Sequence, residues 1–108
     1  MNKYQVKLES HMIGDDLLVV LTGGEKPHCG AVALALPYEK TASCSLLSVP
    51  QHKDGDLAKP LAEQIAKRTG KNVVLVAGIH VDNATTDDIQ TLVENSQREV
   101  DKFLEALA

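Results

Sequence analysis

One short segment of the sequence gathers several reactive side chains between two apolar runs. The segment GGEKPHCG, residues 23–30, holds two glycines, a glutamate, a lysine, a histidine and a cysteine. A hairpin connection needs only a pair such as Asn-Gly, so the additional groups favour a functional loop. Side chains of adjacent extended residues point in opposite directions, which makes His28 a poor general base for the Cys29 thiol. The segment therefore suits ligand binding better than covalent catalysis.

Three of the four histidines follow apolar runs, at points where strands are expected to end. They are His28 in GGEKPHCG, His52 in VPQHKDGD and His80 in GIHVDNAT. Three neutral imidazoles that meet at one end of a sheet can bind zinc or a similar ion and leave one position open for water. The long spacings between these histidines match no compact metal motif, and a loop histidine often only braces the fold. A metal-dependent enzyme with a three-histidine site is therefore an alternative. It requires the fold to bring the three histidines together.

A phosphate is a second candidate ligand for the same loops. Gly23 and Gly24 can expose backbone N–H groups in an anion-binding nest, and Lys26 can add a positive charge. The expected start of the last helix, near Thr85, offers further N–H donors. The sequence has neither a P-loop nor a GxGxxG pattern, so glycines that serve only turn geometry are the competing interpretation.

Apolar patterns along the chain predict five strands and two helices that position these loops. Strands are expected over residues 4–9, 17–22, 31–36, 43–49 and 72–79, and helices over 56–69 and from Thr85 onward. Asp56 is a candidate N-cap for the first helix, although Pro60 would then follow just past its first turn. Asp88, three residues after Thr85, suggests a capping box for the second helix.

The element order ββββαβα predicts a single α+β domain over residues 1–108. The first four strands are expected to form an antiparallel meander. A right-handed crossover through the first helix should then add the fifth strand in parallel orientation. Both helices are expected on one face of this sheet.

Composition disfavours several classes of function. A formal net charge of −4 and only three aromatic side chains provide little support for nucleic-acid binding. No apolar run approaches the roughly 20 residues of a membrane helix, and the N-terminus lacks the apolar core of a signal peptide. We therefore expect a cytoplasmic protein without membrane contact, in which Cys29 and Cys44 are free thiols. At 108 residues, a homo-oligomer is expected as readily as a monomer.

Three strings in the sequence resemble a known family of accessory proteins. The strings LTGGEKPHCGAVALA, GIHVDNAT and DDIQTLVENSQREVDKFL are similar to those of the LpdD-like prenylated-flavin chaperones, the D-type accessory subunit associated with gallate decarboxylase. The similarity runs from about Asp16 to the end of the chain. It implies a non-enzymatic protein that binds prenylated flavin mononucleotide (prenylated FMN) as cargo and delivers or matures it for a UbiD-type decarboxylase. A flavin prenyltransferase is a candidate second partner.

The resemblance also implies a fold similar to that of proteasome-assembly-chaperone domains, which are small α+β dimers, and a set of cofactor-binding residues. Residues that match the family strings are Gly23, Gly24, Lys26, Pro27, His28, Gly30, Gly78, His80, Asp82 and Ala84. His52 belongs to a weaker segment, where Gln51 departs from the family's Pro-Gly-His pattern. In such a site the glycines and Lys26 would suit the phosphate, and His28 and His80 the polar edge of the flavin ring. No catalytic residue and no metal ligand is implied.

The small number of aromatic residues leaves the flavin ring without an obvious stacking partner. Aliphatic side chains or a second subunit would have to form the walls of the site. A ligand-free assembly module, which binds only a decarboxylase subunit, is therefore a further alternative.

Overall fold

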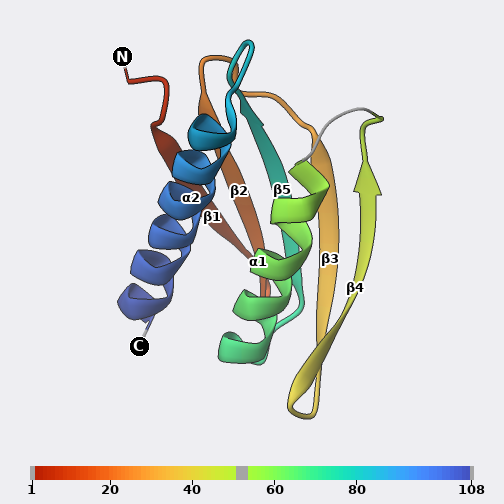
Figure 1. Ribbon diagram of the computed structural model, residues 1–108. Helices are drawn as coiled ribbons and strands as arrows, with labels where there is room; N and C mark the ends of the chain where they lie inside the picture. Colours follow the sequence, from red (N-terminus) through yellow and green to blue (C-terminus); the bar gives the residue numbers. More distant parts are fainter. Residues whose placement is uncertain (1, 51–53, 108) are drawn as a thin grey trace.

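The protein was analysed as a computed structural model that describes residues 2–50 and 54–107. Its elements are β1 (Val6–Ile13), β2 (Asp16–Gly24), β3 (Ala31–Tyr38), β4 (Thr41–Ser48), α1 (Asp54–Thr69), β5 (Val73–His80) and α2 (Thr86–Leu107). One five-stranded mixed sheet forms a layer, and both helices pack against the same face of it (Figure 1). The α+β class and the order ββββαβα are therefore confirmed.

The strand order is β1-β2-β5-β3-β4, with β5 between the two hairpins β1–β2 and β3–β4. It pairs in parallel with β2 and antiparallel with β3. The crossover through α1 therefore makes β4 and β5 parallel, as expected, but passes over β3 instead of placing them side by side. A strand that is apolar on both faces, such as VVLVAGI, is suited to this central position. One consequence is that the chain between β2 and β3 has to cross the end of β5.

The core lies between the sheet and the helices. Alternate residues of the three central strands face the helices and are fully or almost fully buried: Leu17, Val19, Leu21, Ala31, Ala33, Ala35, Val73, Leu75 and Ala77. The alanines of β3 allow α1 to lie close to the sheet, where it buries Ala58, Ala62, Ile65 and Ala66. Helix α2 contributes Leu92, Val100 and Leu104 to the same core. Within the described residues no helix is long and apolar enough to cross a bilayer.

Most element boundaries differ from those expected by one or two residues, and the end of β1 differs by four. Strand β1 covers Val6–Ile13 rather than residues 4–9, because the pairing with β2 continues to a tight turn at Gly14, where φ is +60°. Helix α1 begins at Asp54 rather than at Asp56 and includes Pro60. Proline has no N–H to donate to the carbonyl four residues earlier, so this helix lacks one internal hydrogen bond in its second turn.

Candidate functional site

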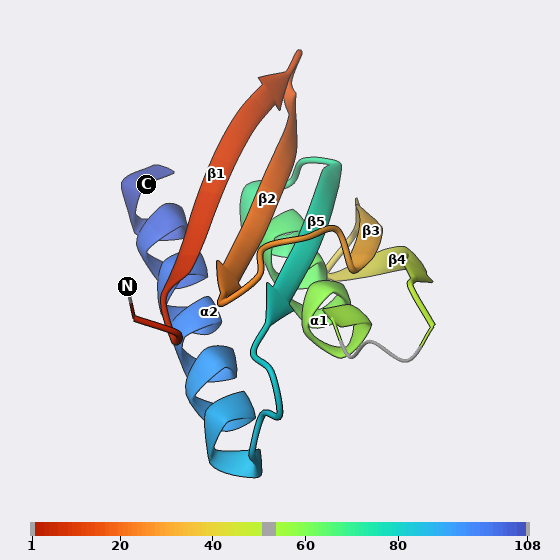
Figure 2. The same ribbon diagram turned by 90° about the horizontal axis from the view of Figure 1, so that it is seen from above.

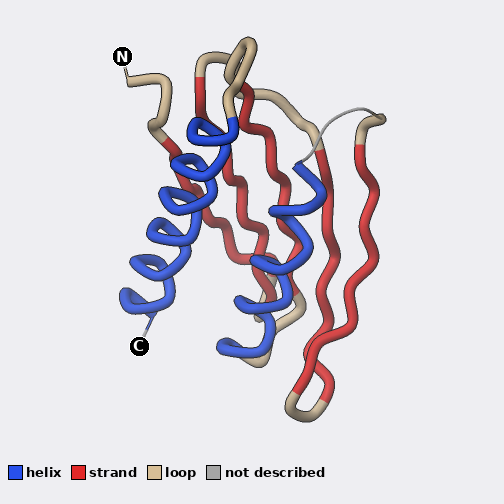
Figure 3. Tube along the Cα trace, in the orientation of Figure 1, coloured by secondary structure: helices blue, strands red, loops and turns tan. Residues whose placement is uncertain are grey.

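The loop after β2 lies against the end of β5, so two of the three histidine segments meet. Backbone N–H groups of Glu25 and Lys26 donate to the carbonyl of His80, at 2.7 and 3.2 Å, and that of Gly30 donates to Ala77 at 2.9 Å. Figure 2 shows this connection passing across β5, and Figure 3 shows it beside the loop that leads from β5 to α2. The third histidine, His52, lies outside the described residues.

Three of the glycines allow the loop and the strand to approach closely. A Cβ at Gly78 would collide with the backbone carbonyl of His28, and a Cβ at Gly24 would collide with that of His80. Gly24 also has a φ of +76°, a conformation that L side chains rarely adopt. A Cβ at Gly30 would collide with the carboxylate of Asp54. These positions therefore require glycine for local packing.

Asp54 is a buried carboxylate that joins three segments of the site. Its side chain is 5% exposed. One oxygen accepts the backbone N–H of Ile79 at 3.0 Å, and the other lies 3.3 Å from Nε2 of His28, whose side chain is 27% exposed. Gly30 leaves the space in which the carboxylate and the imidazole meet. Asp54 was not among the expected site residues, and its position in the segment VPQHKDGD was the only signal in the sequence.

His80 lies in a second aspartate-histidine pair, which is more exposed. Its Nε2 is hydrogen-bonded to Oδ1 of Asp82 at 2.9 Å, and Nζ of Lys26 lies 3.3 Å from the same carboxylate. The hydrogen bond from His80, followed by the contact with Lys26, lowers the pKa of Asp82. The backbone N–H of Asp82 donates to Glu25 at 3.0 Å, which ties the two loops together.

The two pairs face each other through their imidazole rings. The ring centroids of His28 and His80 are 6.2 Å apart, and the rings are nearly perpendicular at 85°. Each ring has its own aspartate, Asp54 or Asp82, within contact distance. The imidazole of His80 is 38% exposed and can exchange hydrogen bonds with the polar edge of a ligand. Both ring nitrogens of His28 are buried, so His28 would contact a ligand only after the loop moves.

The donors expected for a phosphate are partly used by the protein itself. The N–H of Gly24 donates to the carbonyl of Gln5 at 3.0 Å, and those of Glu25 and Lys26 donate to His80. Lys26 is the remaining phosphate-binding candidate of this loop. Its ammonium group is paired with Asp82, yet its side chain is 66% exposed, so it can reorient toward an anion.

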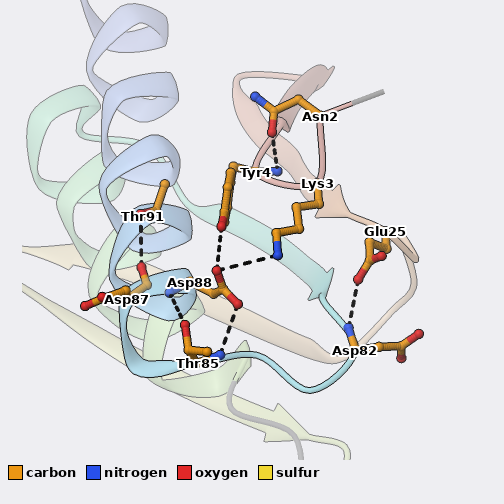
Figure 4. A network of polar contacts seen from close by, with 9 residues as sticks. All are labelled: Asn2, Lys3, Tyr4, Glu25, Asp82, Thr85, Asp87, Asp88 and Thr91. Carbon is orange, nitrogen blue, oxygen red and sulfur yellow. Dashed lines mark hydrogen bonds and ion pairs between the residues drawn. The ribbon is translucent and has the colours of Figure 1, made fainter.

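The start of α2 is occupied by its own side chains, as Figure 4 shows. Thr85 Oγ1 accepts the N–H of Asp88, and Asp88 accepts the N–H of Thr85, both at 3.0 Å. The hydroxyl of Tyr4 also donates to Asp88, at 2.6 Å. This hydrogen bond, followed by that from the Thr85 N–H, lowers the pKa of Asp88. The expected capping box is therefore confirmed, and the carboxylates of Asp87 and Asp88 make this helix end unfavourable for an anion.

In the described part of the chain, few side chains are arranged for metal binding or for thiol chemistry. No group of three or more His, Cys, Asp and Glu residues within 2–50 and 54–107 has the geometry to hold a metal ion. Cys29 and Cys44 are free thiols, as expected. Burial raises the pKa of the Cys44 thiol, which reduces its reactivity at neutral pH.

Fold and site together define a small α+β protein in which two histidines and two aspartates meet near the end of β5 as a candidate binding site. The sequence matches the family described as the prenylated flavin chaperone LpdD-like domain over residues 1–108. It is 30% identical over 108 residues to Protein LpdD of Lactiplantibacillus plantarum, covering 95% of this chain and 79% of that protein. The chain therefore belongs to the LpdD-like prenylated flavin chaperone family, which supports an accessory role.

Proposed function

We propose that the protein binds prenylated FMN as cargo and delivers or matures it for a UbiD-type decarboxylase, without catalysing the decarboxylation. One observation carries the proposal: His28 and His80, from two distant segments, lie ring to ring at the end of β5, and each contacts an aspartate. Membership of a family described as prenylated flavin chaperones supports a prenylated flavin as the cargo.

The side chains at the end of β5 are chemically suited to prenylated FMN. A flavin ring presents carbonyl oxygens and ring nitrogens along one edge, which match the exposed imidazole of His80. His28, whose ring nitrogens are buried, would join this contact after a shift of its loop. Lys26 would exchange its contact with Asp82 for the phosphate, a charge-assisted interaction. Aliphatic residues near the loop, such as Ile79 of β5, would have to cover the ring faces. The flavin supplies redox and covalent chemistry only after transfer, and the role of this chain is to bind and orient it.

Co-expression with a flavin prenyltransferase tests the proposal directly. The protein is purified without air, its near-ultraviolet and visible absorbance is recorded, and released small molecules are identified by mass spectrometry. We expect close to one prenylated FMN per chain or per dimer. A colourless protein that still co-purifies with a decarboxylase subunit would instead establish the ligand-free assembly module. A stoichiometric metal ion without flavin would establish the metalloenzyme.

The double substitution of His28→Ala and His80→Ala tests whether the site lies at this edge. We expect the loaded fraction to fall at least tenfold while the circular dichroism spectrum stays unchanged. His11→Ala is the matched control, because His11 is an exposed histidine on β1, which lies at the edge of the sheet. Unfolding of the double variant would mean that these histidines brace the fold, and normal loading would place the site elsewhere.

A further inference from the structure

A groove of about 240 Å³ lies between the two helices. Figure 1 shows α1 and α2 side by side on the sheet, and both helices start at the end of the sheet where β5 ends. The apolar walls of the groove include Leu57 and Pro60 of α1 and Ile89 and Val93 of α2. We refer to it as the interhelical groove.

The walls of the interhelical groove leave aliphatic side chains in contact with water. Ile89 is 41% exposed and Val93 is 45% exposed. They are four residues apart on α2 and therefore lie on the same face of the helix. Further along, the side-chain amide of Gln97 donates to Gln64 at 3.0 Å and joins the two helices. The protein therefore has an apolar surface between its helices that a partner can bury.

Carboxylates border the interhelical groove. Asp56 is part of its wall, Glu94 is exposed next to Val93, and Asp101 accepts a hydrogen bond from Gln97 at 2.9 Å. In the part of the chain that the structure describes, none of these three carboxylates takes part in an ion pair. An apolar groove with an acidic border is complementary to an apolar segment that carries Lys or Arg at its sides.

The length of the groove matches about two turns of a helix. Gln64 lies eight residues after Asp56, and Gln97 lies eight residues after Ile89. A helix rises about 1.5 Å per residue, so each wall is about 12 Å long. Side chains at positions i and i+7 of a partner helix are about 10.5 Å apart along its axis. Apolar grooves recognise amphipathic helices through anchors at this spacing.

The groove also begins close to the candidate site. Asp54, which contacts His28 and accepts the N–H of Ile79, is the first residue of α1. Asp56 follows two residues later, a rise of about 3 Å along the helix. A partner in the groove would therefore lie beside the residues that are proposed to bind the cargo.

We propose that the interhelical groove docks a basic amphipathic helix of the decarboxylase subunit that receives the cargo. Aliphatic side chains of this helix insert between Leu57, Ile89 and Val93, and its Lys or Arg side chains pair with Asp56 and Glu94. The buried anchors supply most of the affinity, and the charges at the border favour this partner over acidic ones. The identity of the partner rests on the proposed function, whereas the chemistry of its docking segment follows from the groove.

Calorimetric titration of the full chain with a purified UbiD-type decarboxylase subunit, prepared without its flavin, tests the docking surface. Val93→Glu should weaken binding at least tenfold, because the complex would bury an unpaired carboxylate. Ile13→Glu is the matched control, since Ile13 is 54% exposed at the end of β1; this variant should bind like the wild type.

Glu94→Lys is a second variant that changes only an exposed charge and leaves the apolar walls intact. It should also weaken binding, and the difference from the wild type should shrink at high salt, where charges at the border are screened. A wild-type protein that does not bind the decarboxylase would overturn the proposal. Binding of both Val93→Glu and Glu94→Lys at wild-type strength would overturn it as well.

Flavin absorbance after co-expression with a flavin prenyltransferase separates docking from cargo binding. Val93→Glu and Glu94→Lys should carry as much flavin as the wild type, because neither residue lies at the histidine pair. If the wild type carries flavin and the variants still bind the decarboxylase normally, docking in the groove is wrong and the cargo role stands. If the variants lose decarboxylase binding and the wild type carries no flavin, docking is supported and the cargo role is wrong.

Discussion

Substitution of Asp54 best separates ligand binding from fold stability at the end of β5. Its carboxylate accepts the N–H of Ile79 and faces Nε2 of His28. Asp54→Asn keeps an acceptor for Ile79 but removes the charge beside the imidazole. We expect an intact fold and a tenfold to hundredfold loss of ligand affinity, since a hydrogen bond to a charged group contributes about 1.5–3 kcal/mol.

Asp54→Ala supplies the contrast, because it also leaves the buried N–H of Ile79 without an acceptor. An unsatisfied buried group of this kind costs about 1–3 kcal/mol of unfolding free energy. Urea denaturation of both variants, combined with ligand titration, separates these effects. If Asp54→Asn binds as tightly as the wild type, the carboxylate serves only the fold.

Gly78 provides a second test at the scale of one residue. The added Cβ of Gly78→Ala would meet the carbonyl of His28, so the loop has to move away from β5. We expect a loss of stability of about 1–3 kcal/mol, typical of overpacking, and a larger loss of ligand binding. Gly14→Ala is a useful comparison, because no atom lies within 4 Å of its Cβ and only its φ of +60° is strained. Equal effects on ligand binding would show that the close approach at Gly78 is unimportant.

At the scale of elements, the start of α2 links the N-terminal segment to the site. Asp88 accepts hydrogen bonds from Tyr4 and Thr85, and its folded pKa is lowered. A carboxylate with a lowered folded pKa stabilises the protein above its unfolded pKa of about 3.9. That contribution is lost as the pH falls through the folded value.

Asp88→Asn should therefore destabilise the protein at pH 7, and its difference from the wild type should shrink as the pH is lowered from about 4. Denaturant unfolding across this range measures the effect. Thr85→Ala should cost about 1 kcal/mol, as for other N-cap losses, with a weaker dependence on pH. A difference for Asp88→Asn that does not change with pH would mean that the charge of Asp88 is unimportant.

Local patterns predicted the elements well but not every boundary or contact. The two helices and four strands with clear apolar periodicity were confirmed close to their expected residues. β1 extends beyond Glu9 because an edge strand is held by its backbone pairing with β2, and its apolar pattern fades in HMI. The position of β5 between β2 and β3 results from tertiary pairing, which no local pattern encodes.

The candidate site was likewise predicted only in part from the sequence. The glycine-rich loop and the end of β5 meet as the sequence predicts, because chemically rich loops follow strands that end at the same edge. Asp54 could not be predicted, since its role depends on where α1 begins and on the close approach at Gly30. The phosphate donors expected at Gly24 and Thr85 form internal hydrogen bonds instead. The sequence identifies hydrogen-bonding groups, whereas only the fold determines their partners.

At the scale of the whole molecule, the homodimer expected from the sequence would make stability depend on concentration. If folding and association are coupled, a tenfold rise in protein concentration adds about 1.4 kcal/mol to the stability of each dimer by mass action. The melting temperature of the wild type should then rise by about 2–5 °C for each tenfold step. A chain that stays monomeric should melt at one temperature throughout. Differential scanning calorimetry over a hundredfold range measures this slope, and a flat wild-type profile would contradict coupling between folding and dimerisation.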